Sequence, residues 1–281
     1  MGTLNELCLF AGVGGGMLGT GLVGCTPICA VENDRFCRRI LLQRQRDGYL
    51  PRFPIWDNIQ TFNARPWRGR VDVVSGGFPC QDISAAGQGA GLAGARSGLV
   101  FEMLRVVDQV QAPFMFAENS PLLRRRGLDQ ILQRLDSMGY DAVWCVLGAW
   151  HVGAPHKRNR LWILAKQANL EVHPTCGPTE ISSDPHNSWE RIRSLDGEVA
   201  EPPAPPEMVA DPAGVKLDDS SGQSGREYRG TFGPWKHPPD FARMDDGSTP
   251  VMDRVKATGN AQVPLVAATA FQILWNLLVD G

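Results

Sequence analysis

One cysteine in this sequence stands where a reactive thiol would be placed. Residues 75–84, SGGFPCQDIS, put Cys80 directly after Pro79 in a glycine-rich loop that follows the apolar run VDVV. Proline fixes its own φ and restricts the residue before it, so the backbone at Cys80 is held stiffly. At a sheet edge beside a helix start its thiolate is favoured, and a thiolate is the nucleophile of covalent catalysis. The alternative is an ordinary loop cysteine.

A carboxylate closes another apolar run. In FAEN, residues 116–119, burial would push Glu118 toward its neutral form. A partly protonated Glu118 could donate to a ring nitrogen or act as a general acid. The alternative is that this segment only caps a helix, since Asn119-Ser120-Pro121 also looks like a helix start.

Two arginines follow in the segment GAPHKRNRLWILA. In an extended chain Arg158 and Arg160 point to opposite faces. One of them could then reach an active site, while the other holds the cysteine loop or a phosphate.

The glycine-rich segment LCLFAGVGGGMLGTGL predicts a strand, a tight turn and a helix. Such a turn places backbone amides and a helix N-terminus at the carboxyl edge of a sheet, where α/β folds bind ligands. Gly14, Gly16 and Gly19 match GxGxxG, and Glu32 ends the next expected strand, where an acidic residue accepts from ribose hydroxyls. The pattern indicates a nucleoside cofactor, either NAD or S-adenosylmethionine; a structural turn with a surface glutamate is the alternative.

Short apolar runs alternate with amphipathic stretches over the first part of the chain, which predicts an α/β fold with a mostly parallel sheet covered on both faces. Strands are expected at 4–11, 26–32, 71–77, 113–119, 140–149 and 160–165, and helices at 15–22, 33–45, 97–110 and 128–139.

The chain of 281 residues divides by composition into three parts. Residues 1–166 form the expected catalytic and cofactor-binding domain. Residues 167–248 are rich in proline, glycine, serine and aspartate, which is typical of a loop-rich insert. Residues 249–281 regain order, and one long helix after Pro264 is expected to pack back on the first domain.

Composition is that of an ordinary globular protein, with 43% hydrophobic and 21% charged residues. A net charge of -2 argues against a strongly basic nucleic-acid coat, although basic clusters at 35–46, 124–126 and 157–160 allow local patches. No apolar run could span a bilayer and no signal peptide is evident, so we expect a cytoplasmic protein. The seven cysteines show neither CxxC nor zinc spacing, so reduced thiols and no metal site are expected.

These segments, in this order, resemble the DNA (cytosine-5)-methyltransferases. FAGVGGG is similar to the family's first cofactor motif, VVSGGFPCQDIS to its catalytic loop, and FAENS, HKRNR and GNAQVP to three later motifs. The likeness covers about 1–165 and 250–280. It implies a Rossmann-like S-adenosylmethionine-dependent methyltransferase fold, with the insert as a small target-recognition domain.

The resemblance also implies a reaction. Cys80 would add to carbon 6 of a flipped cytosine, and carbon 5 would then take the methyl group of S-adenosylmethionine. Glu118 would hold the ring nitrogen and amino group, and Arg158 the base oxygen, with Arg160 supporting the cysteine loop. Ser84 belongs to the glycine-rich loop that would close over the base.

Cofactor contacts implied by the resemblance lie in the glycine turn, at strand ends, around the catalytic loop and in the last motif: Phe10, Ala11, Gly12, Gly14, Gly15, Glu32, Asn33, Asn58, Ile59, Pro79, Leu99, Asn260 and Ala261. The family usually has aspartate where this chain has Asn58, so the adenine contact passes to Asn58 or to Asp57.

The expected partner is double-stranded DNA, bound by a monomer in a bacterial or phage-infected cell, and a cognate restriction endonuclease would fit the same system. Three alternatives stay open. A tRNA cytosine-5 methyltransferase would keep the chemistry, but Gln81-Asp82-Ile83 after the cysteine favours DNA. An NAD-dependent oxidoreductase would leave the cysteine and arginine motifs unexplained, and a binding-only relative would not need them.

Overall fold

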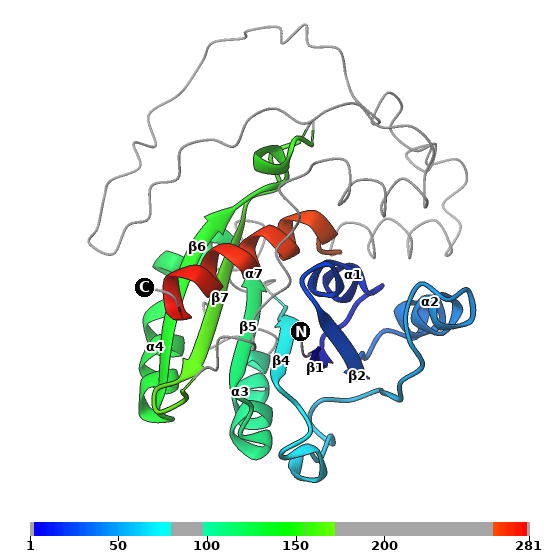
Figure 1. Cartoon of the computed structure of the whole chain (residues 1–281), viewed down its shortest axis with the longest axis horizontal. Helices are drawn as coiled ribbons and strands as arrows, with labels where there is room; N and C mark the ends of the chain where they lie inside the picture. The colour runs from blue at the N-terminus through cyan, green and yellow to red at the C-terminus, as the bar shows by residue number, and fades with distance from the viewer. Residues whose placement is uncertain (1–2, 80–97, 155, 172–260, 280–281) are drawn as a thin grey trace, which may run out of the picture.

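The computed structural model describes residues 3–79, 98–154, 156–171 and 261–279. At their centre lies a sheet whose seven described strands follow the order β3-β2-β1-β4-β5-β7-β6 (Figure 1). The strands are β1 (Leu4–Leu9), β2 (Cys25–Val31), β3 (Ile55–Trp56), β4 (Val73–Gly77), β5 (Phe114–Asn119), β6 (Tyr140–Leu147) and β7 (Arg160–Gln167).

Strands β1 to β5 pair in parallel, whereas β7 runs antiparallel to both β5 and β6. Because β6 is antiparallel to β7, it runs in the same direction as β1 to β5, and β7 is the reversed strand among the seven described. The prediction of a mostly parallel sheet is therefore correct, with β7 as the exception. Because β7 is antiparallel to β5, its first residues lie beside the end of β5: Asn119 pairs with Leu161. The hairpin thus brings the arginine segment to the edge where the parallel strands end.

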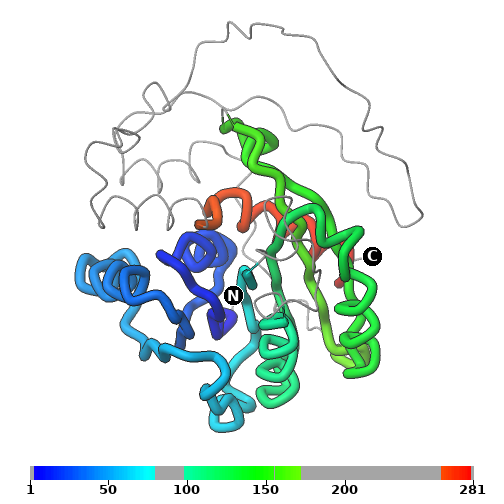
Figure 2. The backbone as a smooth tube through the Cα atoms, turned by 180° about the vertical axis from the view of Figure 1, so that it is seen from behind, coloured from blue at the N-terminus to red at the C-terminus, as the bar shows by residue number. Residues whose placement is uncertain are grey.

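Helices cover both faces of the sheet (Figures 1 and 2). They are α1 (Gly15–Leu22), α2 (Arg35–Arg46), α3 (Leu99–Val110), α4 (Leu128–Ser137) and α7 (Pro264–Val279), with the 3-10 turns η1 (Arg65–Trp67), η3 (Pro121–Arg125) and η4 (Ala149–Val152). Alternate strand residues explain the two layers: Leu7 and Leu9 of β1 join the core with α3 and α4, whereas Leu4 packs on the side of α7. Asp34 starts α2, accepting a hydrogen bond from the Phe36 amide at 2.8 Å.

The C-terminal helix α7 lies against α1 and against β6 and β7. A Cβ added at Gly19 would run into the Pro264 carbonyl oxygen and would lie 2.8 Å from the Cβ of Ala267. On the sheet side, Phe271 meets Phe116 edge to face at 5.1 Å between ring centroids. The two ends of the described chain therefore share one packed layer.

Most predicted elements are present within a few residues of their expected ends. Strand β3 was not predicted because two residues cannot show an alternating pattern. None of the helices described here could cross a membrane. The division into three domains stays a prediction, since most of the proposed insert lies outside the described residues.

Candidate active site

The glycine turn after β1 is built from backbone conformations that most side chains avoid. Phe10, Gly12 and Gly14 have φ of 51, 54 and 88°, in the left-handed region. A Cβ at Gly14 would lie 2.9 Å from Leu41 of α2, so this glycine also lets two layers approach. The turn leads directly into α1 and leaves its first-turn amides available for a ligand.

Glu32 holds this turn. Its carboxylate is 9% exposed and accepts from the amide of Gly12 at 2.6 Å and of Asp34 at 2.7 Å. Burial raises the pKa of Glu32, and these two hydrogen bonds lower it. A carboxylate has about four lone-pair sites, so Glu32 can still accept from a ribose hydroxyl. The spacing that suggested a cofactor carboxylate thus corresponds to a contact between Glu32 and the glycine turn.

The other predicted cofactor residues fall into two groups. Phe10, Ile59 and Leu99 all pack against the core cluster on the α3 side. Asn33 is exposed, and its carbonyl accepts from Arg38 at 2.6 Å. Asn58 is half-buried and caps a turn by accepting from the Gln60 amide at 2.9 Å.

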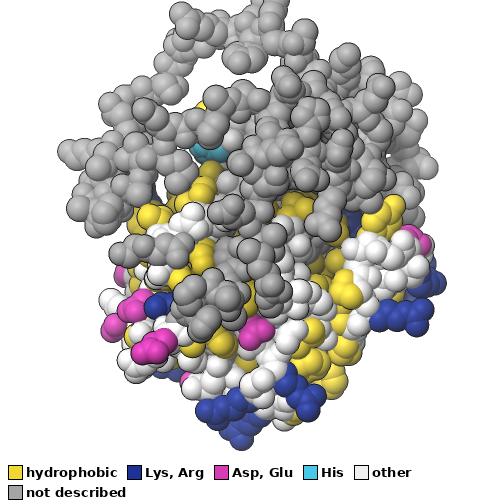
Figure 3. Space-filling model, in the orientation of Figure 1, with side chains coloured by type: hydrophobic (Ala, Val, Ile, Leu, Met, Phe, Trp, Pro, Cys, Tyr) yellow, Lys and Arg dark blue, Asp and Glu magenta, His cyan; other side chains and the backbone are white. Residues whose placement is uncertain are grey.

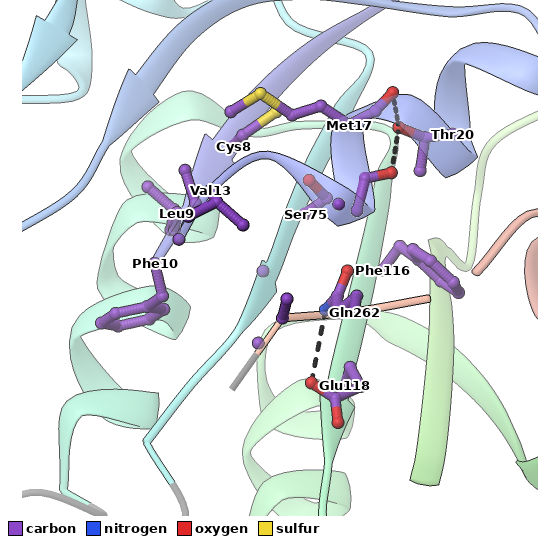
Figure 4. A pocket seen from close by; sticks show the side chains of 17 residues that line it. Cys8, Leu9, Phe10, Val13, Met17, Thr20, Ser75, Phe116, Glu118 and Gln262 are labelled. Atoms are coloured by element: carbon purple, nitrogen blue, oxygen red, sulfur yellow. Dashed lines mark hydrogen bonds between the residues drawn. The ribbon is translucent and has the colours of Figure 1, made fainter. Parts of the chain in front are cut away.

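Glu118 is the residue before the last one of β5 and is 8% exposed. Its Oε1 lies 2.8 Å from Nε of Arg160, and its Oε2 accepts from Nε2 of Gln262 at 3.4 Å. Burial raises the pKa of Glu118, while Arg160, the Gln262 amide and Arg158 lower it. Figure 4 shows Glu118 and Gln262 facing each other in the pocket. The carboxyl group is therefore desolvated but engaged at both oxygens.

Arg158 takes a different place. Its backbone has φ of 35°, and its guanidinium donates to the carbonyl of Ala261. Burial lowers the pKa of Arg158, and the charge of Arg160 lowers it further. The resemblance put Arg158 on the base and Arg160 on the cysteine loop; in the structure, Arg160 is the arginine that forms the ion pair with Glu118.

The predicted nucleophile Cys80 lies outside the described residues, as do Ser84 and Asn260. The chain just before Cys80 is well placed: Asn119 Nδ2 donates to the Phe78 carbonyl at 3.0 Å, and Gly77 pairs with Glu118 across β4 and β5. Gly77 and Phe78, which precede Cys80 in the sequence, therefore lie beside the end of β5.

One pocket joins these parts (Figure 4). Its walls come from the glycine turn and α1, from Ser75, Gly76 and Gly77 of β4, and from Glu118, Ala261 and Gln262. The predicted residues Phe10, Ala11, Gly12, Gly15, Glu118 and Ala261 therefore line a common cavity. In the described part of the chain no three His, Cys, Asp or Glu side chains are grouped for a metal.

Two polar residues at this edge were not predicted from the sequence. Asn119 and Gln262 stand inside the motifs FAENS and GNAQVP, but nothing in their residue types shows what they contact. Their place inside these motifs was the one signal in the sequence that could have pointed to them. Asn119 contacts Phe78, and Gln262 contacts Glu118, through tertiary structure.

The sheet has the strand order β3-β2-β1-β4-β5-β7-β6, and its carboxyl edge carries a glycine turn and the carboxylate of Glu32. This arrangement defines a Rossmann-like S-adenosylmethionine-dependent methyltransferase fold. A family model described as C-5 cytosine-specific DNA methylase matches residues 4–210. The chain belongs to this family.

Similar proteins agree with that assignment. The type II methyltransferase M.CviJI of Paramecium bursaria Chlorella virus IL3A is 29% identical over 60% of this chain and 45% of its own. M.PspPI of a Psychrobacter species is 33% identical over 58% of this chain and 39% of its own. The chain thus spans less than half the length of these two relatives. A solved structure of the Entamoeba histolytica methyltransferase EhMeth shares the fold, with TM-score 0.51, 16% identity, and 62% of this chain and 56% of that chain covered.

Proposed function

We propose that this chain is a DNA (cytosine-5)-methyltransferase that uses S-adenosylmethionine and forms a covalent adduct through Cys80. One observation carries the proposal: a single pocket places the Glu118 carboxyl, held by Arg160, next to the glycine turn. A base-binding acid and a nucleoside-binding turn are needed side by side for methyl transfer to a base. The family match favours this reaction over the NAD-dependent alternative.

The residues present fit S-adenosylmethionine. The turn at Gly12 and Gly14 carries no side chains, so a ligand can approach its backbone closely. Glu32 offers carboxylate oxygens for the ribose, and Phe10, Ile59 and Leu99 offer an apolar wall. When bound, the cofactor supplies a methyl group on a positively charged sulfur. Asn58, Asn33, Pro79, Asn260 and Ala261 complete the proposed set of contacts.

The chemistry follows from the proposed roles of three side chains. The Cys80 thiolate adds to carbon 6 of the cytosine, which moves an electron pair toward carbon 5. Carbon 5 takes the methyl group as the carbon–sulfur bond breaks, and loss of the carbon 5 proton then expels the Cys80 thiolate. Glu118 holds the ring nitrogen and the amino group, and its raised pKa suits a carboxyl that shares a proton with the ring nitrogen. Arg160 holds one oxygen of that carboxyl group.

Double-stranded DNA is the proposed substrate. Carbon 6 is unreachable in a stacked duplex, so the base must be flipped out, with Ser84 in the loop that closes behind it. Residues 167–248 are proposed to read the target sequence. Relatives named as type II methyltransferases suggest a restriction-modification system for this chain. In such a system the chain would act as a monomeric cytoplasmic enzyme beside a cognate endonuclease.

Exposed basic side chains gather over α2 at the right-hand edge of the face in Figure 3, where Arg35, Arg39 and Arg46 are exposed. Arg38 of the same helix instead donates to the Glu32 carbonyl at 2.9 Å. Arg38 therefore supports the end of the strand that carries Glu32, whereas Arg35, Arg39 and Arg46 form a solvated face.

The test uses duplex DNA that carries 5-fluorocytosine in place of cytosine. Fluorine cannot leave carbon 5 as the proton does, so the covalent intermediate is trapped. With S-adenosylmethionine present, we expect a denaturation-resistant adduct whose peptide mass locates it at Cys80. Cys80→Ala should give no adduct and still bind the cofactor, and a fully active Cys80→Ala would overturn the mechanism. An adduct on RNA that carries 5-fluorocytosine, but not on duplex or genomic DNA that carries it, would instead support the tRNA alternative.

A further inference from the structure

Gln262 lies between the two halves of the pocket. It stands two residues before α7, and its backbone and side chain face glycines on both sides. A Cβ at Gly15 would run into the Gln262 carbonyl oxygen, and one at Gly16 into its Oε1. A Cβ at Gly77 would lie 2.9 Å from its Nε2. The space that Gln262 fills exists only because three neighbouring positions carry no side chain.

This fit gives the Gln262 amide one direction. Its oxygen faces the first turn of α1, and its nitrogen faces Glu118, whose Oε2 accepts the hydrogen bond at 3.4 Å. A Cβ at Gly77 would also lie 2.7 Å from that same Oε2. Glycine at this position thus allows the amide and the carboxyl group to meet over β4.

The Glu118 carboxyl has one partner on each oxygen. Arg160 occupies Oε1 from β7, and Gln262 occupies Oε2 from the segment that leads into α7. A carboxyl group held at one oxygen can still rotate about its last bond, because that torsion is broad and roughly two-fold. A second partner on the other side removes this freedom. Arg158 favours the ionised form of Glu118 through its charge, and its guanidinium donates to the carbonyl of Ala261.

We propose that Gln262 is a positioning residue that fixes the Glu118 carboxyl group toward the target base. This inference rests on the proposed function, in which Glu118 touches the base and Gln262 acts through it. A carboxamide suits the role because it is neutral: it donates to the carboxyl group without adding a second positive charge beside Arg160. Gln262 therefore contributes to methyl transfer and little to cofactor binding.

The activity test compares Gln262→Leu with Gln45→Leu. Leucine keeps the size of the side chain and removes the donor. Gln45 is a matched control, because its Nε2 donates to the Phe53 carbonyl at 3.0 Å, outside the pocket lining. We expect single-turnover transfer by Gln262→Leu to fall about tenfold, the effect of one hydrogen bond of ordinary net strength, with cofactor Kd within about twofold of wild type. Transfer by Gln262→Leu within twofold of the control would overturn the proposal.

Gln262→Glu provides a second variant with a distinct signature. Two carboxyl groups at hydrogen-bonding distance cannot both ionise, so one pKa of the pair rises strongly. The protonated carboxyl then donates as the amide did. We expect transfer by Gln262→Glu to recover toward wild type as pH falls, which a merely structural role of Gln262 would not produce. A pH profile parallel to wild type would count against the proposal.

A titration separates this inference from the proposed function. Glu118 faces Arg160, Arg158 and the Gln262 amide, all of which favour its ionised form. With ¹³C-labelled glutamate, and Glu118→Gln to assign its carbonyl signal, Gln262→Leu should raise the pKa of Glu118, whereas Gln45→Leu should leave it unchanged. An unmoved Glu118 titration would overturn the positioning role. If the wild-type chain formed no fluorocytosine adduct, the proposed function would be refuted. The titration would still decide whether Gln262 holds the Glu118 carboxyl group.

Discussion

The contact between α1 and α7 can be tested with two glycines of one helix. Gly19 and Gly21 both lie in α1, but only Gly19 faces α7: a Cβ there would meet the Pro264 carbonyl and lie 2.8 Å from Ala267 Cβ. At Gly21 an added Cβ would have nothing within 4 Å. Gly19→Ala and Gly21→Ala therefore make the same chemical change in two different surroundings.

The expected magnitudes follow from these distances. Carbon atoms in contact normally lie about 3.5–4.0 Å apart, so alanine at 19 would force α1 and α7 apart by about 1 Å. Such overpacking costs about 1–3 kcal/mol, whereas glycine to alanine in an exposed helix position gains about 1 kcal/mol. Gly21→Ala should thus raise the free energy of unfolding, and Gly19→Ala should lie about 1–3 kcal/mol below Gly21→Ala.

Urea unfolding, followed by circular dichroism and by tryptophan fluorescence, measures both variants, and coincident transitions would justify a two-state analysis. We also expect Gly19→Ala to lower methyl transfer, because a displaced α7 carries Gln262 away from Glu118. Equal stabilisation by the two alanines would show that α7 does not pack on Gly19, and the reasoning from the close approach would be wrong.

Three further changes have defined outcomes. Glu6 is 0% exposed and burial raises its pKa, so the folded state holds the Glu6 proton more tightly than the unfolded chain does. The contribution of protonated Glu6 to the free energy of unfolding is therefore fully present below the ordinary glutamate pKa, and it is lost as pH rises through the pKa of Glu6 in the folded state. Glu6→Gln, which keeps an acceptor for Thr20, should flatten that loss in a series of melting temperatures against pH. Arg160→Leu leaves Oε1 of Glu118 without its 2.8 Å partner and should lower single-turnover transfer at least about a hundredfold, with cofactor binding retained. Tyr140→Phe removes a 2.6 Å bond to the buried Ala112 carbonyl and should cost about 1–3 kcal/mol in urea unfolding without changing methyl transfer.

Local patterns were enough to place most helices and strands. The glycine turn predicts where α1 begins, and Asp34 gives α2 its start, because both features act within a few residues. The antiparallel placement of β7 between β5 and β6 could not be read in the same way. It depends on which strand edge the hairpin meets, and that choice is made by tertiary packing.

The candidate site divides along the same line. The spacing from Gly12 to Glu32 predicted a cofactor carboxylate, and the two groups are in contact. The alternation of Arg158 and Arg160 did not show which arginine reaches Glu118, because the left-handed backbone at Arg158 interrupts the extended geometry. Gln262 and Glu118 are 144 residues apart in sequence, so no local pattern could join them.

The layer shared by α1 and α7 has a consequence for how such chains diversify. Ala261 and Gln262 reach the pocket because α7 packs on α1, whatever the length of chain between residues 171 and 261. The entropy of closing a flexible loop grows only with the logarithm of its length, and each doubling costs about 0.6 kcal/mol. Insertions, deletions and exchanges in that interval are therefore cheap for the sheet and its pocket. If residues 167–248 read the target sequence, as proposed, a change of DNA target by recombination there would leave the residues of the pocket in place.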